Sequence, residues 1–166
     1  MAELSLPDLI TLTEFDGDWD AYYEEVYELF IEDFITSPLV SFKGKRMGLK
    51  RQPITAGKEA TFYHLTHEGS DEQNRQPDFR RMERIRWVKF MIANCDHEKI
   101  KMWRNKRGND EYILIYHEEE RYLVVLADRG EYVLPWTAYL ILYDNRKRSL
   151  LKEYEAYKKA EAAKST

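Results

Sequence analysis

The sequence of 166 residues contains one cysteine, Cys95, which excludes an internal disulfide and a zinc cluster built on cysteines. No apolar run approaches the roughly 20 residues that a membrane-spanning helix needs. The first nine residues have neither a basic stretch nor an apolar core, so we expect no signal peptide. We therefore expect a cytoplasmic protein in a reducing environment, with no membrane partner.

Motifs that identify several common enzyme classes are also absent. The chain has no Walker loop and no GxGxxG, GxSxG, CxxC or HExxH motif. Nucleotide-driven, nicotinamide-dependent and zinc-protease activities therefore lose their usual support. His64 and His67 have no third metal ligand at a known spacing, so we expect neither a metal nor another cofactor.

Charge is distributed unevenly along the chain, although the net charge is only −4. Residues 1–42 contain eleven acidic side chains and no Lys or Arg, whereas residues 43–107 contain seventeen basic and eight acidic ones. The remainder, residues 108–166, has nine basic and eleven acidic side chains. A basic middle indicates a polyanionic partner, while the alternative is that the acidic and basic segments pair with each other.

The order of expected elements indicates a single domain over residues 1–166. It divides into an acidic helical segment, 1–40, and a basic α+β body, 41–162. Asp18 is a plausible N-cap for a first helix over 19–34. The other expected elements are a loop at 41–58, a strand at 60–66, a basic helix from Pro77 to about residue 94, strands at about 99–104, 111–117, 121–127 and 131–142, and a last helix at 145–162.

Short polar links between the four later strands predict an antiparallel arrangement, with a hairpin closed by Glu118, Glu119 and Glu120. The expected fold class is therefore α+β, with an antiparallel sheet of about four to five strands and helices packed on one face.

Five residues are candidates for catalysis: His64, His67, Arg104, Thr137 and Tyr139. Thr137 and Tyr139 are two positions apart in a strand, so they point to the same face. With a histidine from the earlier strand and Arg104 from a middle strand, they could converge on one face of the sheet. A histidine could then act as general base and the arginine could stabilise charge on phosphorus, without a metal.

A second group of residues suits RNA binding, because arginine contacts phosphates through two N–H groups and aromatic rings stack on bases. Its members are Lys58, Arg81, Arg84, Arg86, Trp103 and Arg107. The alternatives are that the arginines form a solvated helix face and that Trp103 belongs to the core.

The layout resembles the barnase–EndoU–colicin–RelE superfamily of metal-independent ribonucleases, which occurs in phage and toxin contexts. The resemblance covers about residues 58–160 and depends on His64 in Phe-Tyr-His-Leu-Thr-His, the cationic stretch around Arg104, and Thr137-x-Tyr139. It implies a helix packed on an antiparallel sheet, with a His, a cation, a Thr or Ser and a Tyr on the open face. The function that we expect is a metal-independent endoribonuclease, a toxin restrained by an inhibitory, antitoxin-like protein partner or by its own acidic segment. Two other functions stay open: a noncatalytic nucleic-acid-binding domain and a protein-interaction module.

Overall fold

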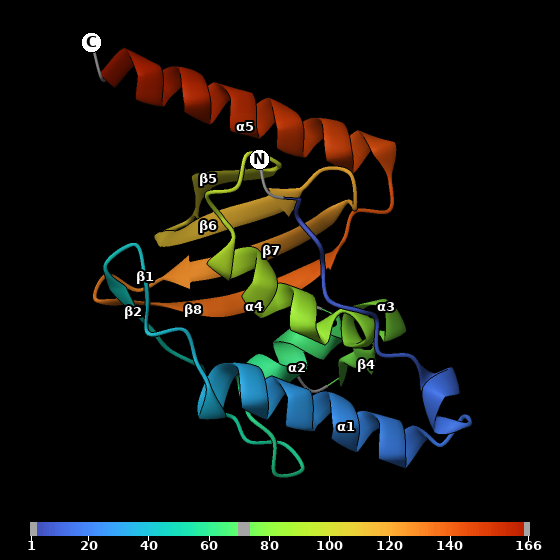
Figure 1. Cartoon of the computed structure of the whole chain (residues 1–166). Helices are drawn as coiled ribbons and strands as arrows, with labels where there is room; N and C mark the ends of the chain where they lie inside the picture. The colour runs from blue at the N-terminus through green and yellow to red at the C-terminus, as the bar shows by residue number, and fades with distance from the viewer. Residues whose placement is uncertain (1–2, 70–73, 165–166) are drawn as a thin grey trace.

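The computed structural model describes residues 3–69 and 74–164 and has an α+β fold built on a curled sheet of six strands (Figure 1). Four of the strands follow one another in an antiparallel arrangement, as the sequence predicts. They are β5 (Ile100–Arg107), β6 (Asp110–His117), β7 (Tyr122–Asp128) and β8 (Tyr132–Leu140). Gly108 and Gly130 close two of the hairpins with φ of 64° and 92°, a region that glycine enters without steric cost.

Two short strands complete the sheet from a segment that the sequence predicts to be a loop. They are β1 (Ser41–Phe42) and β2 (Lys45–Met47). β2 pairs in parallel with the start of β8, which gives the order β1-β2-β8-β7-β6-β5. The expectation of four to five strands was therefore slightly too low, because strands of two or three residues leave no alternating pattern to recognise.

The first and last helices agree with the sequence analysis. α1 (Trp19–Ile31) follows a short 3-10 helix, η1 (Leu12–Phe15), and continues as a π-helical turn, η2 (Glu32–Thr36). The Asp18 carboxylate caps α1 by accepting a hydrogen bond from the Ala21 amide at 3.1 Å. α5 (Asp144–Lys164) is the longest helix of the described residues. No helix in these ranges combines the length and apolarity needed to cross a membrane.

The segment at 60–66, predicted as a strand, is a helix, α2 (Ala60–Thr66). Its β-branched and aromatic residues favour a strand locally, but tertiary packing overrides that preference. Six of its seven residues are buried, so the segment shows neither helical nor alternating periodicity. The Thr66 hydroxyl donates a hydrogen bond to the Phe62 carbonyl at 2.7 Å, which satisfies a polar group inside the core.

The single basic helix expected from Pro77 to residue 94 is divided. α3 (Phe79–Glu83) ends at Arg84, whose φ of −107° and ψ of 22° leave the helical region, and α4 (Ile85–Ala93) follows directly. A small two-stranded pairing precedes these helices, between β3 (His67–Glu68) and β4 (Gln76–Pro77). The basic residues of the two helices have different surroundings, since Arg81 of α3 binds the carbonyl groups of His64 and His67, whereas Arg86 of α4 pairs with Glu32.

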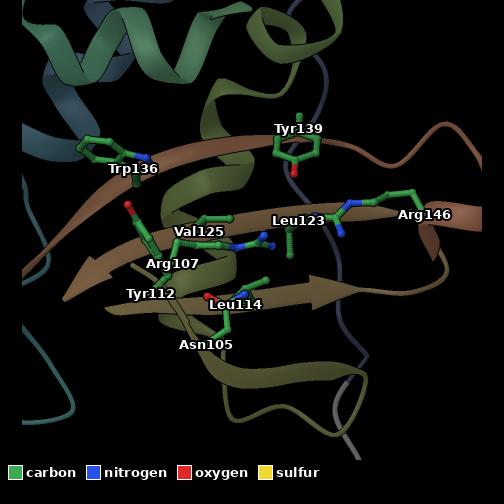
Figure 2. A pocket seen from close by; sticks show the side chains of 9 residues that line it. All are labelled: Asn105, Arg107, Tyr112, Leu114, Leu123, Val125, Trp136, Tyr139 and Arg146. Atoms are coloured by element: carbon green, nitrogen blue, oxygen red, sulfur yellow. The ribbon is translucent and has the colours of Figure 1, made fainter. Parts of the chain in front are cut away.

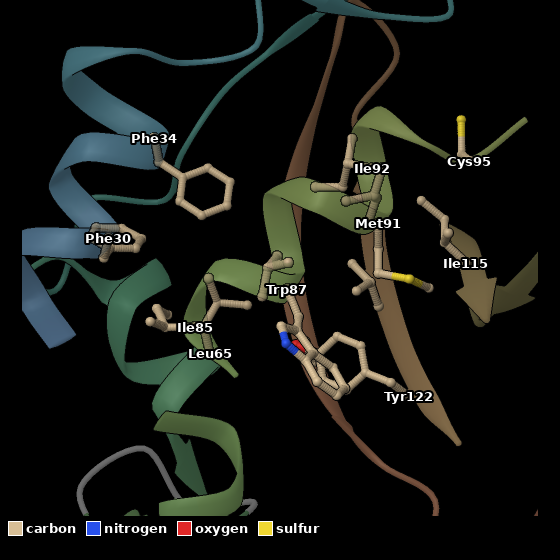
Figure 3. Packing of buried hydrophobic residues seen from close by; sticks show 14 of the residues in the cluster. Phe30, Phe34, Leu65, Ile85, Trp87, Met91, Ile92, Cys95, Ile115 and Tyr122 are labelled. Atoms are coloured by element: carbon tan, nitrogen blue, oxygen red, sulfur yellow. The ribbon is translucent and has the colours of Figure 1, made fainter. Parts of the chain in front are cut away.

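Hydrophobic residues cover both faces of the sheet, which corrects the expectation of helices on one face. The first face carries Ile113, Ile115 and Val124 against α1, α2 and α4. Its core includes an edge-on contact between the Trp87 and Tyr122 rings, with centroids 5.2 Å apart (Figure 3). The second face carries Trp103, Leu114, Tyr116 and Leu123, and α5 packs on it through Leu150 (Figure 1).

Candidate functional site

The second face of the sheet remains partly open beside α5, and Thr137 and Tyr139 of β8 belong to it. Thr137 pairs with Val125 and Tyr139 with Leu123, both on that face. The prediction that Thr137 and Tyr139 share a face is confirmed. The register shifts between Val125 and Leu126, so Trp136 is the extra residue of a β-bulge. A bulge redirects a side chain relative to its strand, and Trp136 lies at the edge of the open face.

A cavity of about 220 Å³ lies on this open part of the second face (Figure 2). We call it the face cavity. Its walls combine two arginines, three aromatic residues, one amide and three aliphatic residues, namely Arg107, Arg146, Tyr112, Trp136, Tyr139, Asn105, Leu114, Leu123 and Val125. None of these nine residues is acidic, which contrasts with the chain's net charge of −4.

Among the described residues, no acidic side chain forms an ion pair with the two arginines of the face cavity. In the described ranges neither Arg107 nor Arg146 forms an ion pair, whereas most other arginines of the sheet and of α3 and α4 do. Arg107 ends β5 and Arg146 belongs to the first turn of α5, so they approach the cavity from opposite sides (Figure 2). Their charge is therefore available to an anionic ligand.

Trp136 is one of the three aromatic residues that line the face cavity, and two cations lie over its ring. The Arg129 guanidinium lies 5.3 Å and the Lys50 ammonium 5.6 Å from its ring centroid. The Tyr112 ring lies 6.3 Å away, and the His64 ring meets Trp136 edge-on at 5.1 Å. The indole therefore combines an aromatic ring with nearby positive charge.

A second cavity of about 270 Å³, which we call the edge cavity, adjoins the first. It lies between α3, the end of β8 and the loop into α5. Tyr139 and Arg146 line both cavities. The edge cavity has mixed charge, since Arg80 and Arg81 line it together with Glu68 and Asp78.

Arg81 joins three of the elements around the site. Its guanidinium donates to the carbonyl oxygens of His64 and His67 at 3.3 and 2.8 Å, and it lies 3.3 Å from the Thr137 hydroxyl. It also lies over the Tyr139 ring at 5.2 Å. Arg81 thus contacts four of the predicted site residues, namely His64, His67, Thr137 and Tyr139. It reaches the two histidines only through their backbone carbonyl groups.

Both candidate histidines are buried, each with 5% of its surface exposed. His64 lies within α2 and His67 in β3, not at the end of a strand and in the following loop as expected. Burial, with the charges of Arg75 and Arg81, lowers the pKa of His67 to about 4, so this imidazole is neutral at pH 7. Neither histidine lines the face cavity, although His64 contacts its wall at Trp136.

Arg104 lies on the first face of the sheet, so the prediction that it shares a face with Thr137 and Tyr139 is wrong. It pairs with Ile113, which belongs to the first-face core. Its guanidinium binds the Asp128 carboxylate at 2.8 Å, and the Lys45 ammonium binds the same carboxylate at 2.8 Å. Desolvation acts to raise the pKa of Asp128, but these hydrogen bonds outweigh it and hold the pKa well below its usual range. The three residues form a structural link between β2, β5 and β7.

Most of the residues predicted to bind RNA have other partners. Lys58 is buried beside Glu24 at 2.9 Å and over the Tyr27 ring at 4.8 Å. Arg86 pairs with Glu32 at 2.6 Å, and Arg84 with Glu83 at 3.5 Å.

The remaining predicted RNA-binding residues divide between the core and the two cavities. Trp103 is 1% exposed and packs against Tyr154 of α5, so it belongs to the core, which was the alternative to RNA binding. Arg107 lines the face cavity and Arg81 the edge cavity.

Several residues of the face cavity were not predicted as site residues. Arg146, Asn105, Tyr112 and Trp136 line it. The alternation of β6 and β8 could have placed Tyr112 with Tyr139, had the strand register been known. The bulge at Trp136 leaves no comparable signal.

Neither the protein-family models, nor the curated proteins, nor the solved structures gave a match to this chain. The inference of function therefore rests on the geometry of the second face. Within the described ranges, no group of three or more His, Cys, Asp and Glu side chains is placed to hold a metal ion.

Proposed function

We propose that this protein cleaves single-stranded RNA at the face cavity without a metal ion. The observation that carries the proposal is the composition of the cavity. Arg107 and Arg146, which have no ion-pair partner among the described residues, lie beside the rings of Tyr112, Trp136 and Tyr139 and no carboxylate lines the wall. Arginines bind phosphate oxygens and aromatic rings stack on unpaired bases, so this wall suits a nucleotide within a strand.

The proposed reaction is attack of the ribose 2′-oxygen on the adjacent phosphorus. The O2′–P bond forms, the P–O5′ bond breaks, and the products end in a 2′,3′-cyclic phosphate and a 5′-hydroxyl. Arg107 and Arg146 stabilise the additional negative charge on the phosphorane, and such electrostatic help is worth roughly 2.7–4 kcal/mol for each well-placed donor. Asp, Glu, His and Cys, the residues that most often bind metal ions in proteins, are absent from the nine lining residues.

Two side chains are our candidates for proton transfer. The Tyr139 hydroxyl lines the cavity and is the candidate donor of the proton that the leaving 5′-oxygen takes. His64 is the candidate base for the 2′-hydroxyl proton, because its ring contacts the cavity wall at Trp136. This role requires the 2′-hydroxyl to reach His64 past the edge of the Trp136 ring, which stays in place as the surface on which the base stacks. Thr137 and Arg81 position Tyr139 and the end of α2.

A noncatalytic RNA-binding role is the second candidate. The burial of His64 and His67 and the place of Arg104 on the first face favour it, since both remove expected catalytic groups from the cavity. The same wall would then hold RNA without cleaving it. The third function considered from the sequence, a protein-interaction module, stays a prediction.

The decisive experiment is incubation of the purified protein with a fluorescent single-stranded RNA in EDTA. We expect fragments ending in a 2′,3′-cyclic phosphate, and at least a tenfold loss of rate in Arg107→Ala and Tyr139→Phe, from the loss of one charged donor or one proton donor. Tyr132→Phe removes a hydroxyl from the same strand outside the cavity and is the matched control. His64→Gln tests the base.

Intact RNA that binds the protein would support the second candidate, and absence of both binding and cleavage would contradict both. A toxin held by an inhibitory protein remains part of the proposal. In that case cells should tolerate expression of Tyr139→Phe better than expression of Tyr132→Phe.

A further inference from the structure

The face cavity and the edge cavity meet at a shared wall, and we call the pair the groove. Tyr139 and Arg146 line both of them, and the volumes are about 220 and 270 Å³. Ligand pockets usually occupy roughly 300–1,000 Å³. Each cavity alone is smaller than that range, whereas the two together fall within it. The size therefore suits a ligand that spans the shared wall.

The two ends of the groove differ in charge. The face cavity has arginines and no carboxylate, while Glu68 and Asp78 line the edge cavity. Asp78 is occupied by an ion pair with Arg81 at 3.4 Å and by capping α3, but Glu68 is exposed. A carboxylate repels a phosphate, yet it accepts hydrogen bonds from ribose hydroxyls and from amino groups of bases. A phosphate is thus favoured at the shared wall and in the face cavity, and a nucleoside in the edge cavity.

The edge cavity also has an exposed aromatic ring, which makes no ring or cation contact with the other described residues. Tyr143 is 72% exposed and Leu142 is 52% exposed, in the loop between β8 and α5. Both line the cavity next to Arg146. A tyrosine ring exposed to this degree stabilises the fold little, but it is placed to stack on a base in the edge cavity.

We infer that the groove binds two consecutive nucleotides of a single strand. One base stacks on Trp136 in the face cavity, the next lies against Tyr143 in the edge cavity, and the phosphodiester between them lies at Tyr139 and Arg146. The inference rests on the proposed function for the class of ligand. It adds to that function that the phosphodiester at the shared wall is the one that is cleaved.

The test compares the affinity of the full chain for a 2′-O-methyl dinucleoside monophosphate and for a 5′-mononucleotide, by titration calorimetry. The methyl group blocks attack by the 2′-oxygen, so binding is measured apart from cleavage. We expect the dinucleotide to bind at least tenfold more tightly, because it adds a second stacked base. Tyr143→Ala should weaken dinucleotide binding about tenfold and leave mononucleotide binding within twofold.

Arg146→Ala should remove most of the preference for the dinucleotide, since the shared phosphodiester loses its cation. Arg148→Ala is the matched control, because Arg148 is exposed on the same helix and lines neither cavity. Equal affinity for the two ligands, or an equal loss for both in Tyr143→Ala, overturns the two-nucleotide groove and leaves the proposed function standing. Failure of both ligands and of longer RNA to bind overturns the proposed function and the groove together.

Discussion

His67 illustrates how burial changes the chemistry of a single residue. Its ring lies 4.7 Å from that of Tyr63 and 6.2 Å from that of Tyr23, and its Nδ1 is 2.9 Å from the Thr66 hydroxyl. Burial lowers its pKa to about 4, below the 6.5 of an exposed histidine. Between these two pH values the unfolded chain binds more protons at this position than the folded chain. The contribution of His67 to the free energy of unfolding is therefore fully present above pH 6.5 and is lost as the pH falls towards 4.

We expect protonation at His67 to lower the unfolding free energy of the wild-type protein by about 2 kcal/mol when the pH falls from 7 to 5. Urea denaturation at both pH values measures the loss. His67→Gln removes the titrating group, so its loss over the same interval should be smaller by that amount, whatever its stability at pH 7. Titration of the His67 ring by NMR should independently give a midpoint near 4. Identical pH dependence in wild type and variant would contradict the prediction.

At the scale of the elements, Arg81 holds the C-terminal end of α2 against β8. The last carbonyl groups of a helix lack partners within it, and here a guanidinium from α3 binds the carbonyls of His64 and His67. A cation at this end also interacts favourably with the helix dipole. The same group contacts the Thr137 hydroxyl, so α2, α3 and β8 depend on one side chain.

We expect Arg81→Ala to lower the unfolding free energy by about 2–3 kcal/mol, because hydrogen bonds to a charged donor are worth roughly 1.5–3 kcal/mol and buried carbonyls lose their partner. Arg81→Lys should recover only part of this, since an ammonium cannot reproduce the planar array of donors. Arg80→Ala, at the exposed neighbouring position, should change stability by less than about 0.5 kcal/mol. Hydrogen exchange should show faster opening of α2 in Arg81→Ala alone. Equal stability of the two alanine variants would exclude the capping role.

Elements with one buried face could be predicted from the sequence, and elements buried all round could not. The strands β5 to β8 alternate between two environments, and α1 has an apolar stripe, so both were recognised. α2 is buried on almost every side, so its sequence lacks a helical pattern and predicts a strand. The break at Arg84 depends on packing around α3 and α4, which no local pattern records.

The candidate site was predictable only where it depended on positions within one strand. Thr137 and Tyr139 are two residues apart, so alternation alone placed them on one face. Placing Arg104 required the register between β5 and its neighbours, and a shift of one residue moves a side chain to the opposite face. Arg107 and Arg146 meet because α5 returns over the second face, a tertiary relation that the sequence does not reveal.

At the scale of the molecule, the acidic and basic segments pair with each other in part. Glu24 of α1 binds Lys58, and Glu32 binds Arg86. α1 contributes Tyr22, Val26 and Phe30 to the first-face core, on the other side of the sheet from the face cavity (Figure 1). α1 therefore does not cover the face cavity. Deleting residues 1–36 would expose that core, so substitution of exposed carboxylates is the suitable test.

The salt dependence of RNA binding should report the charges of the face cavity and not those of α1. With two phosphate contacts, from Arg107 and Arg146, the slope of log K against log salt concentration should be about −1.4 for a single strand. Arg107→Ala should reduce its magnitude to about 0.7, because one contact is lost.

Neutralising Glu25 and Glu28, which are exposed on α1, should leave the slope and the affinity unchanged, since solvent screens charges beyond about 10 Å at 0.1 M salt. Fluorescence anisotropy with a non-cleavable RNA at several salt concentrations measures these slopes for the wild type and for each variant. Arg148→Ala is the control, and its slope should equal that of the wild type. Tighter binding by the Glu25→Gln, Glu28→Gln variant would show that α1 restrains the site after all, through its long-range field and not through contact.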